Sequence, residues 1–342
     1  MLKTPPVKTL GLLLTIVTMM ACQPQPSQIY LSQWQLFKNQ FLTTQGQVID
    51  TGNGQISHSE GQGYGLLFAA KAVDKATFET IWRWTQQNLQ VRDDHLFIWR
   101  RQPNLPLASE DKNNASDGDI VIAWALLEAA KHWPHKNYQQ RAHEIITDVR
   151  KKLVTQWRQQ PVLLPGHYGF KKPEALTINL SYWVYPAFEQ FALIDSPNFW
   201  HELANSGLTL LPDAQFGHWN LPPNWLKLNH TAQVSEHDKP HFGYDAIRIP
   251  LYLIWGEKAT QQNLAAYSRV YSQHTKKLPA WFDLNDNSSS QYPADHGIAS
   301  VYQLIRYRTG KTDTLQLHSI AKDDHYYTAS LLLLTRLAAE GA

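Results

Sequence analysis

Apolar residues along this chain recur mostly at helical spacing, and few segments show the alternation of a half-buried strand. The pattern predicts about a dozen helices in neighbouring pairs, joined by loops that are often rich in Pro, Asn, Asp and Gly. The expected helical segments are 29–41, 61–73, 76–89, 119–132, 138–157, 178–194, 198–211, 244–255, 260–274, 293–307 and 326–337, with 312–321 as a further short candidate.

An all-α array of helical hairpins either stays open as a solenoid or closes into a ring. About a dozen helices suit six hairpins closed on themselves, so the expected fold class is all-α, an (α/α)6 barrel. Periodicity alone does not close the ring. No interior segment has the composition of a linker, and residues 29–342 are therefore expected to form one domain.

The start of the chain has the features of a targeting segment. Lysines precede an apolar stretch at 10–21 that is too short to span a bilayer, and the only cysteine, Cys22, follows it directly. The arrangement resembles a bacterial lipoprotein signal. It implies a signal peptide over 1–21, a lipidated Cys22 and a polar tether over 22–28.

Two positions in this signal bear on where the protein is found. Met19 stands where such signals usually carry Leu, so simple secretion with cleavage nearby is the alternative. The residue after Cys22 is Gln rather than Asp, which in similar lipoproteins implies the outer membrane, facing the periplasm. The expected location is therefore periplasmic or secreted, with any membrane contact made through the lipid.

Composition separates the classes of partner. The formal net charge is +2, from 31 basic and 29 acidic residues, and there is no long basic run, so no nucleic-acid partner is expected. The chain also has 13 Trp and 15 Tyr, more than packing requires. Their flat apolar faces with polar edges suit sugar rings, although large helical proteins also use Trp in packing.

Three predicted helices begin with acidic residues beside glycine and aromatic residues. Glu60 precedes an apolar run among several glycines, Asp117 and Asp119 flank a glycine before another run, and Asp245 lies three residues before Arg248. Taken singly, each acid also fits a helix cap or an intrahelical ion pair. In a barrel of paired helices, equivalent helix ends meet on one face, so these four acids are expected in one cleft.

Together these segments resemble glycoside hydrolase family 8. The resemblance rests on Ser-Glu-Gly-Gln-Gly-Tyr-Gly at 59–65, Ala-Ser-Asp-Gly-Asp at 115–119 and Tyr-Asp-Ala-Ile-Arg at 244–248, in the family's order. It is strongest to the periplasmic endo-β-1,4-glucanases (cellulases) associated with bacterial cellulose synthase complexes. It implies an (α/α)6 barrel, an inverting mechanism and no cofactor.

The resemblance also implies roles for single residues. Glu60 matches the proton donor, Asp245 the catalytic base, and Asp117 a third acid that helps to hold the sugar and the attacking water. Inversion needs the acid and the base to lie roughly 6.5–9.5 Å apart, with the acid protonated near neutrality. Burial and neighbouring acids are expected to raise the pKa of Glu60. The residues expected to contact the substrate are Tyr64, Trp99, Asp119, Tyr182, Arg248, Tyr326 and Tyr327.

The sequence therefore predicts endo-acting, inverting hydrolysis of β-1,4-glucan, with nascent polymer at a cellulose synthase secretion complex as one source of substrate. Chitosan, xylan and mixed-linkage glucan remain alternative substrates for the same scaffold. A non-catalytic glucan-binding lipoprotein and a polysaccharide lyase are alternatives of other classes. His237 and His241 are spaced four apart beside Glu236 and Asp238, but no His-Glu-x-x-His pattern occurs, so no metal is expected.

Overall fold

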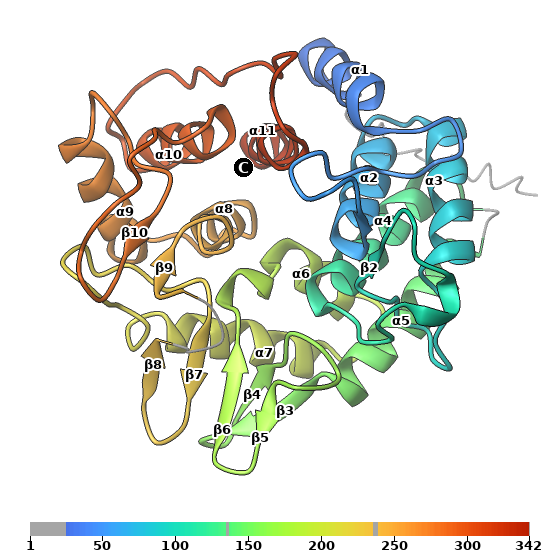
Figure 1. Ribbon diagram of the computed structural model, residues 1–342, viewed down its shortest axis with the longest axis horizontal. Coiled ribbons are helices and arrows are strands. Elements are labelled where there is room, and N and C mark those ends of the chain that lie inside the picture. The colour runs from blue at the N-terminus through green and yellow to red at the C-terminus, as the bar shows by residue number, and fades with distance from the viewer. Residues whose placement is uncertain (1–24, 135–136, 235–238, 342) are drawn as a thin grey trace, which may run out of the picture.

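The structure, a computed structural model, describes residues 25–134, 137–234 and 239–341. Within these residues, two layers of helices surround a common centre (Figure 1). The inner layer contains α2 (Ser59–Lys71), α4 (Ser116–His132), α6 (Tyr185–Ala192), α8 (Arg248–Trp255), α10 (His296–Arg308) and α11 (Tyr326–Glu340). The outer layer contains α1 (Gln28–Phe41), α3 (Lys75–Asn88), α5 (Tyr138–Lys152), α7 (Pro197–Leu210) and α9 (Gln261–Gln273). The predicted all-α barrel is confirmed.

Burial explains which helices lie inside. Helix α2 buries every residue except Glu60 and Lys71, whereas α3 and α9 bury one face, as amphipathic helices on a core do. Small residues let the inner helices approach closely: a Cβ at Gly63 would lie 3.1 Å from the side chain of Val121 on α4. The ring closes where Tyr326, the first residue of α11, packs edge-on against the residue that precedes α2.

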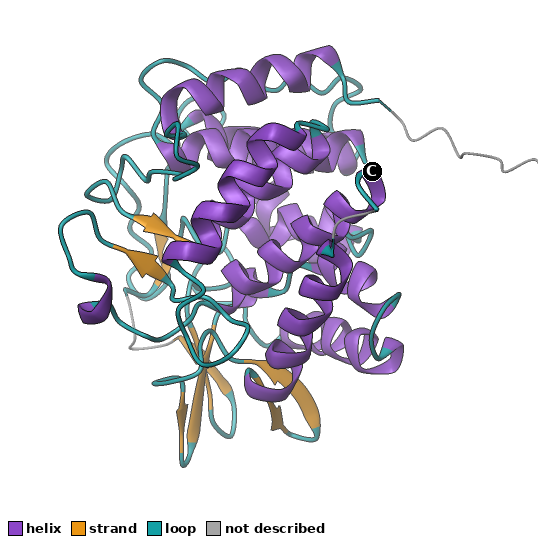
Figure 2. Cartoon of the chain, turned by 90° about the vertical axis from the view of Figure 1, so that its right-hand side faces the viewer, coloured by secondary structure: helices purple, strands orange, loops and turns teal. Residues whose placement is uncertain are grey.

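Short strands lie in the loops that precede the inner helices. β1 (Ser57–His58) pairs with β2 (Arg100–Arg101), and β9 (His241–Phe242) pairs with β10 (Phe282–Asp283). An antiparallel sheet joins, in order, β5 (Lys171–Lys172), β6 (Ala175–Ile178), β7 (Leu226–Leu228) and β8 (Ala232–Val234). In Figure 2 the strands lie in two groups, one at the left of the helical body and one along its lower edge. β1 leads directly into the N-terminal end of α2, and β9 comes shortly before α8.

Several predicted helices were wrong in extent. The segment 138–157 is helical only to Lys152; β3 (Val154–Trp157) and β4 (Gln160–Leu163) then form a hairpin. Its two turn residues, Arg158 and Gln159, have φ of 48° and 65°. Positive φ at both positions is typical of a two-residue hairpin turn, for which Asn-Gly is the usual sequence. The sequence lacked that signal.

Three further segments also differ from expectation. The helix predicted at 178–194 divides into a short 3-10 turn, Leu180–Tyr182, and α6, and the one predicted at 244–255 begins only at Arg248. The short candidate at 312–321 contains no helix, so one position of the outer layer is filled by irregular chain.

The N-terminal predictions fall mostly outside the described residues, including the signal peptide over 1–21 and Cys22. Ser27 caps α1 by accepting a hydrogen bond from Tyr30 N, so the helix begins one residue inside the predicted tether. Among the helices that the structure describes, none has the length and apolar character needed to cross a bilayer.

Candidate active site

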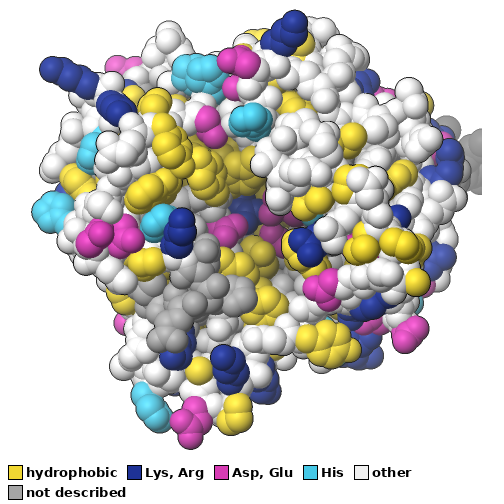
Figure 3. Space-filling model, viewed as in Figure 1, with side chains coloured by type: hydrophobic (Ala, Val, Ile, Leu, Met, Phe, Trp, Pro, Cys, Tyr) yellow, Lys and Arg dark blue, Asp and Glu magenta, His cyan; other side chains and the backbone are white. Residues whose placement is uncertain are grey.

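The predicted acids meet at the N-terminal ends of the inner helices. Glu60 lies in the first turn of α2, Asp117 in the first turn of α4, and Asp245 in the turn that leads into α8. All three line one cleft of about 620 Å³. Figure 3 shows this hollow at the centre of the face, with acidic and basic side chains at its floor.

A glycine sets the two helix starts side by side. A Cβ at Gly118 would lie 2.1 Å from Ser59 Oγ and 2.7 Å from Glu60 N, so only glycine fits where α4 meets α2. This contact brings Asp117 beside Glu60. The glycine between Asp117 and Asp119 is therefore needed for packing, and this packing positions the Asp117 carboxyl group.

One buried arginine joins the three acids. The Arg248 side chain is 2% exposed; its Nη1 donates to Glu60 Oε2 and lies 3.5 Å from Asp117 Oδ2, and its Nη2 lies 2.8 Å from Asp245 Oδ1. Nη2 also donates to Ser181 Oγ at 3.2 Å. A buried guanidinium needs such partners to offset its desolvation. Arg248 therefore fixes the acids relative to one another.

The proton of this cluster lies on a different acid from the one expected. Burial would raise the pKa of Glu60, but the Arg248 guanidinium and a hydrogen bond with Asp117 outweigh it, and the pKa of Glu60 is lowered. Burial, together with the negative charge of Glu60, raises the pKa of Asp117 well above its usual value. Neighbouring carboxyls titrate as a pair, so the two opposite shifts describe Glu60 and Asp117 together. The predicted rise at Glu60 was wrong, because Arg248 contacts it directly.

Aromatic residues form the walls of the cleft. Trp99, Tyr182, Tyr326 and Tyr327, four of the residues expected to contact the substrate, all line it. The Trp99 indole donates to Asp111 Oδ2 at 2.9 Å, and the Arg100 guanidinium lies 4.2 Å from the ring centre. Tyr326 is 1% exposed and presents little surface. Trp99, Tyr182 and Tyr327 are therefore the better placed to meet a sugar ring.

Two predicted contact residues lie behind the cleft. Tyr64 is 1% exposed, and its hydroxyl lies 3.0 Å from Tyr252 Oη and 3.1 Å from Arg248 Nη1, so it supports the arginine from below. Asp119 is fully buried and does not line the cleft. Two residues along a helix turn a side chain to the opposite side, which is why Asp117 faces the cleft and Asp119 does not.

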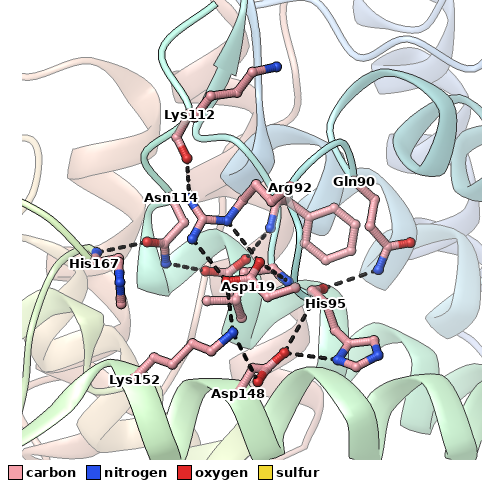
Figure 4. A network of polar contacts seen from close by, with 12 residues as sticks. Gln90, Arg92, His95, Lys112, Asn114, Asp119, Asp148, Lys152 and His167 are labelled. Atoms are coloured by element: carbon pink, nitrogen blue, oxygen red, sulfur yellow. Dashed lines mark hydrogen bonds and ion pairs between the residues drawn. The ribbon is translucent and has the colours of Figure 1, made fainter.

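Asp119 belongs instead to a polar network beneath the rim (Figure 4). It accepts hydrogen bonds from Phe97 N at 2.9 Å and Asn114 Nδ2 at 2.6 Å, and burial raises its pKa to about 7. Nearby, Asp94 binds Arg92 and Lys152. The network holds the segment that leads to Trp99, so it supports the wall of the cleft.

Sequence reasoning missed several lining residues. Tyr244 is 41% exposed at the cleft, and Asp50, His58, Asp295 and His325 also line it. His58 directly precedes the first acidic motif, and Asp295 caps α10, so both could have been found as helix caps. Asp50 lies in a loop with no comparable signal.

Among the residues that the structure describes, no group of three His, Cys, Asp or Glu side chains has an arrangement that could hold a metal ion. His241 lies within that part of the chain and is near Asp283. Glu236, His237 and Asp238, which prompted the metal hypothesis, fall outside it.

Comparisons with known proteins bear on the family and the fold. The sequence model of the family described as "Glycosyl hydrolases family 8" matches residues 10–341. A "Probable endoglucanase" of Novacetimonas hansenii is 39% identical over 324 residues, covering 92% of both chains, and an "Endoglucanase" of Cellulomonas uda is 33% identical, covering 85% of this chain and 82% of its own. The solved endo-beta-1,4-glucanase CMCax from Acetobacter xylinum superposes with a TM-score of 0.86 at 38% identity, covering 92% of this chain and 98% of that one.

Proposed function

The chain belongs to glycoside hydrolase family 8, as its sequence motifs predicted, and from this premise we propose that it is an endo-acting, inverting β-1,4-glucanase. One observation carries the assignment of residues: a single buried guanidinium holds Glu60, Asp117 and Asp245 at the floor of an aromatic cleft. Glu60 is the general acid, Asp245 the general base, and Asp117 the acid that keeps the proton beside Glu60.

The three acids suit these roles because their surroundings differ. The Asp245 side chain is 30% exposed and lies against Arg248 Nη2, so water can reach it. The Asp117 and Glu60 side chains are only 5% and 15% exposed, and burial with the negative charge of Glu60 raises the pKa of Asp117. Protonating the glycosidic oxygen from Glu60 and activating water at Asp245 is the division of labour that inversion requires.

The other charges in the cleft favour a neutral sugar. Chitosan carries amines and would call for uncommitted carboxylates, but Asp50 already faces His58, and Asp295 accepts hydrogen bonds from Ile298 N and Thr328 Oγ1. Neutral β-1,4-glucan needs aromatic faces and hydroxyl partners, which this cleft provides.

The N-terminal signal supports a proposed location in the periplasm, anchored to the outer membrane through Cys22. Five peptide steps separate Cys22 from the helix cap Ser27, so the barrel would lie within about 18 Å of its anchor. Gln25 and Pro26 border a cavity at the C-terminal ends of α2, α4, α8 and α11, whereas the cleft lies at their N-terminal ends. The cleft would thus face away from the membrane, toward polymer leaving a cellulose synthase secretion complex. Release of Cys22→Ser from the membrane fraction would support the anchor, and an unchanged distribution would refute it.

The activity is tested by reducing-end release from carboxymethyl-cellulose, chitosan, xylan and mixed-linkage glucan, with the product anomer followed by NMR. The cellulose derivative should be preferred and give the α-anomer first. Glu60→Gln and Asp245→Asn should each lose roughly 10²–10⁴-fold in kcat, as expected when an acid or base is removed. Glu144→Gln, on the outer helix α5, is the matched control and should keep full activity. Activity that survives Glu60→Gln would overturn the site, and binding of glucan without cleavage would favour a glucan-binding protein.

A further inference from the structure

The helix that carries Glu60 begins with an unusual cap. N-cap positions are usually filled by Ser, Thr, Asp or Asn, but here the His58 imidazole takes that place, and its Nδ1 accepts a hydrogen bond from Gly61 N at 3.0 Å. A ring nitrogen that accepts carries no proton. The proton of the neutral ring must therefore be on Nε2.

An aspartate faces that second nitrogen. His58 Nε2 lies 3.3 Å from Asp50 Oδ2, and the other oxygen of Asp50 accepts a hydrogen bond from Gly52 N at 3.0 Å. The main-chain N–H of Asp50 donates to Ile56 O at 2.8 Å, so the loop holds the carboxylate in place. A carboxylate at Nε2 selects the tautomer that leaves Nδ1 free to accept.

The ring has little room to move. Tyr326 packs edge-on against it, with centroids 5.4 Å apart, and a Cβ at Gly61 would lie 3.3 Å from His58 Cε1 and 3.1 Å from Tyr326 Oη. On the strand side, His58 pairs with Arg100 between β1 and β2. Position 61 must be small for the ring to lie over the first turn of α2.

We propose that Asp50 and His58 form a positioning pair that holds the first turn of α2, and with it Glu60, where its carboxyl meets the glycosidic oxygen. Glu60 lies within the turn that the His58–Gly61 hydrogen bond closes. Without Asp50 the ring is free to adopt the other tautomer, which points an N–H at the N–H of Gly61 and opens the turn. The proposal rests on the assigned role of Glu60.

The test compares two leaving groups. Carboxymethyl-cellulose needs its leaving oxygen protonated, whereas dinitrophenyl β-cellotrioside releases a phenolate that needs no proton. His58→Ala should lower kcat on the polymer by about 10- to 100-fold, with KM within about twofold, because a displaced acid loses rate rather than binding. On the dinitrophenyl substrate, kcat should stay within about twofold of the wild type.

Two conservative variants separate the cap from the pair. His58→Asn places an amide oxygen where Nδ1 was and should restore polymer cleavage, since Asn is a good N-cap. Asp50→Asn should lower kcat on the polymer in the wild-type background and have no further effect in the His58→Asn background. An equal Asp50→Asn effect in both backgrounds would show that Asp50 acts on substrate directly and would overturn the proposal.

The control removes a cap elsewhere. Thr260 caps α9 through a capping box, far from the cleft, so Thr260→Ala should lower Tm and leave kcat on both substrates unchanged. An equal loss of kcat on both substrates in His58→Ala would show that His58 has only a structural role and would overturn the proposal. Full activity in Glu60→Gln would refute the assignment of Glu60 as the acid. Loss of activity in Glu60→Gln together with full activity in His58→Ala would refute the positioning pair alone.

Discussion

The closest fit in the active site lies between the starts of α4 and α2, and Gly118→Ala tests it. The added Cβ would lie 2.1 Å from Ser59 Oγ and 2.7 Å from both Ser59 Cβ and Glu60 N, whereas ordinary contact begins at 3.4 Å. The Ser59 hydroxyl can rotate away, but the main chain at Glu60 must move by about 0.7 Å to restore contact. That movement separates Glu60 from Asp117 and from Arg248.

A displacement of this size near reacting groups is expected to lower kcat on carboxymethyl-cellulose by about 10- to 100-fold. Overpacking should also cost about 1–3 kcal/mol of stability, seen as a fall in Tm of a few degrees. Gly341→Ala is the matched control, because its Cβ would meet nothing nearer than 3.3 Å at the end of α11. A Gly118→Ala enzyme with kcat within twofold and an unchanged Tm would refute the argument that this contact places the acids.

Three further variants probe the charges and walls of the site. Arg248→Lys should lower kcat by about 100-fold and move the alkaline limb of the pH profile upward, because one ammonium cannot join three carboxyls and no longer holds down the pKa of Glu60, the proton donor; an unmoved alkaline limb would contradict this. Burial raises the pKa of Asp119 to about 7, so its contribution to stability is complete below about pH 4 and lost as the pH rises through 7. The difference in Tm between the wild type and Asp119→Asn should therefore become smaller as the pH rises from about 4 to 7. A constant difference would argue against the raised pKa of Asp119. Trp99→Ala should raise KM for the polymer more than it lowers kcat, whereas a change in kcat alone would place Trp99 outside substrate binding.

Much of this site could be predicted because its acids lie where local sequence pattern is most informative. Glu60, Asp117 and Asp245 each stand at the start of an apolar segment, and the fold brings those starts together. Deciding which of Asp117 and Asp119 faces the cleft requires knowing where α4 begins, and the exact start of a helix is poorly defined by sequence. The structure begins that helix at Ser116, three residues before the predicted start.

Other features depend on contacts between distant segments. The hairpin at 154–163 has no Asn-Gly, so its turn was invisible in a pattern that continues a helix. Asp50 reaches His58 only because the loop from 50 to 56 folds back, with Asp50 N bonded to Ile56 O. Both features are determined by tertiary contacts and not by the local sequence preference of the segments involved.

The proton needed for catalysis follows from the number of charges that meet in the cleft. Arg248 supplies one positive charge to three carboxyls, two of which are nearly enclosed. A low-dielectric site does not keep two adjacent carboxylates ionised around one guanidinium, so the pair of Glu60 and Asp117 retains a proton near neutrality. The sequence-based expectation placed that proton on Glu60 through burial and neighbouring acids. The arginine reverses the order within the pair, yet it leaves the proton one hydrogen bond away from the acid that must deliver it.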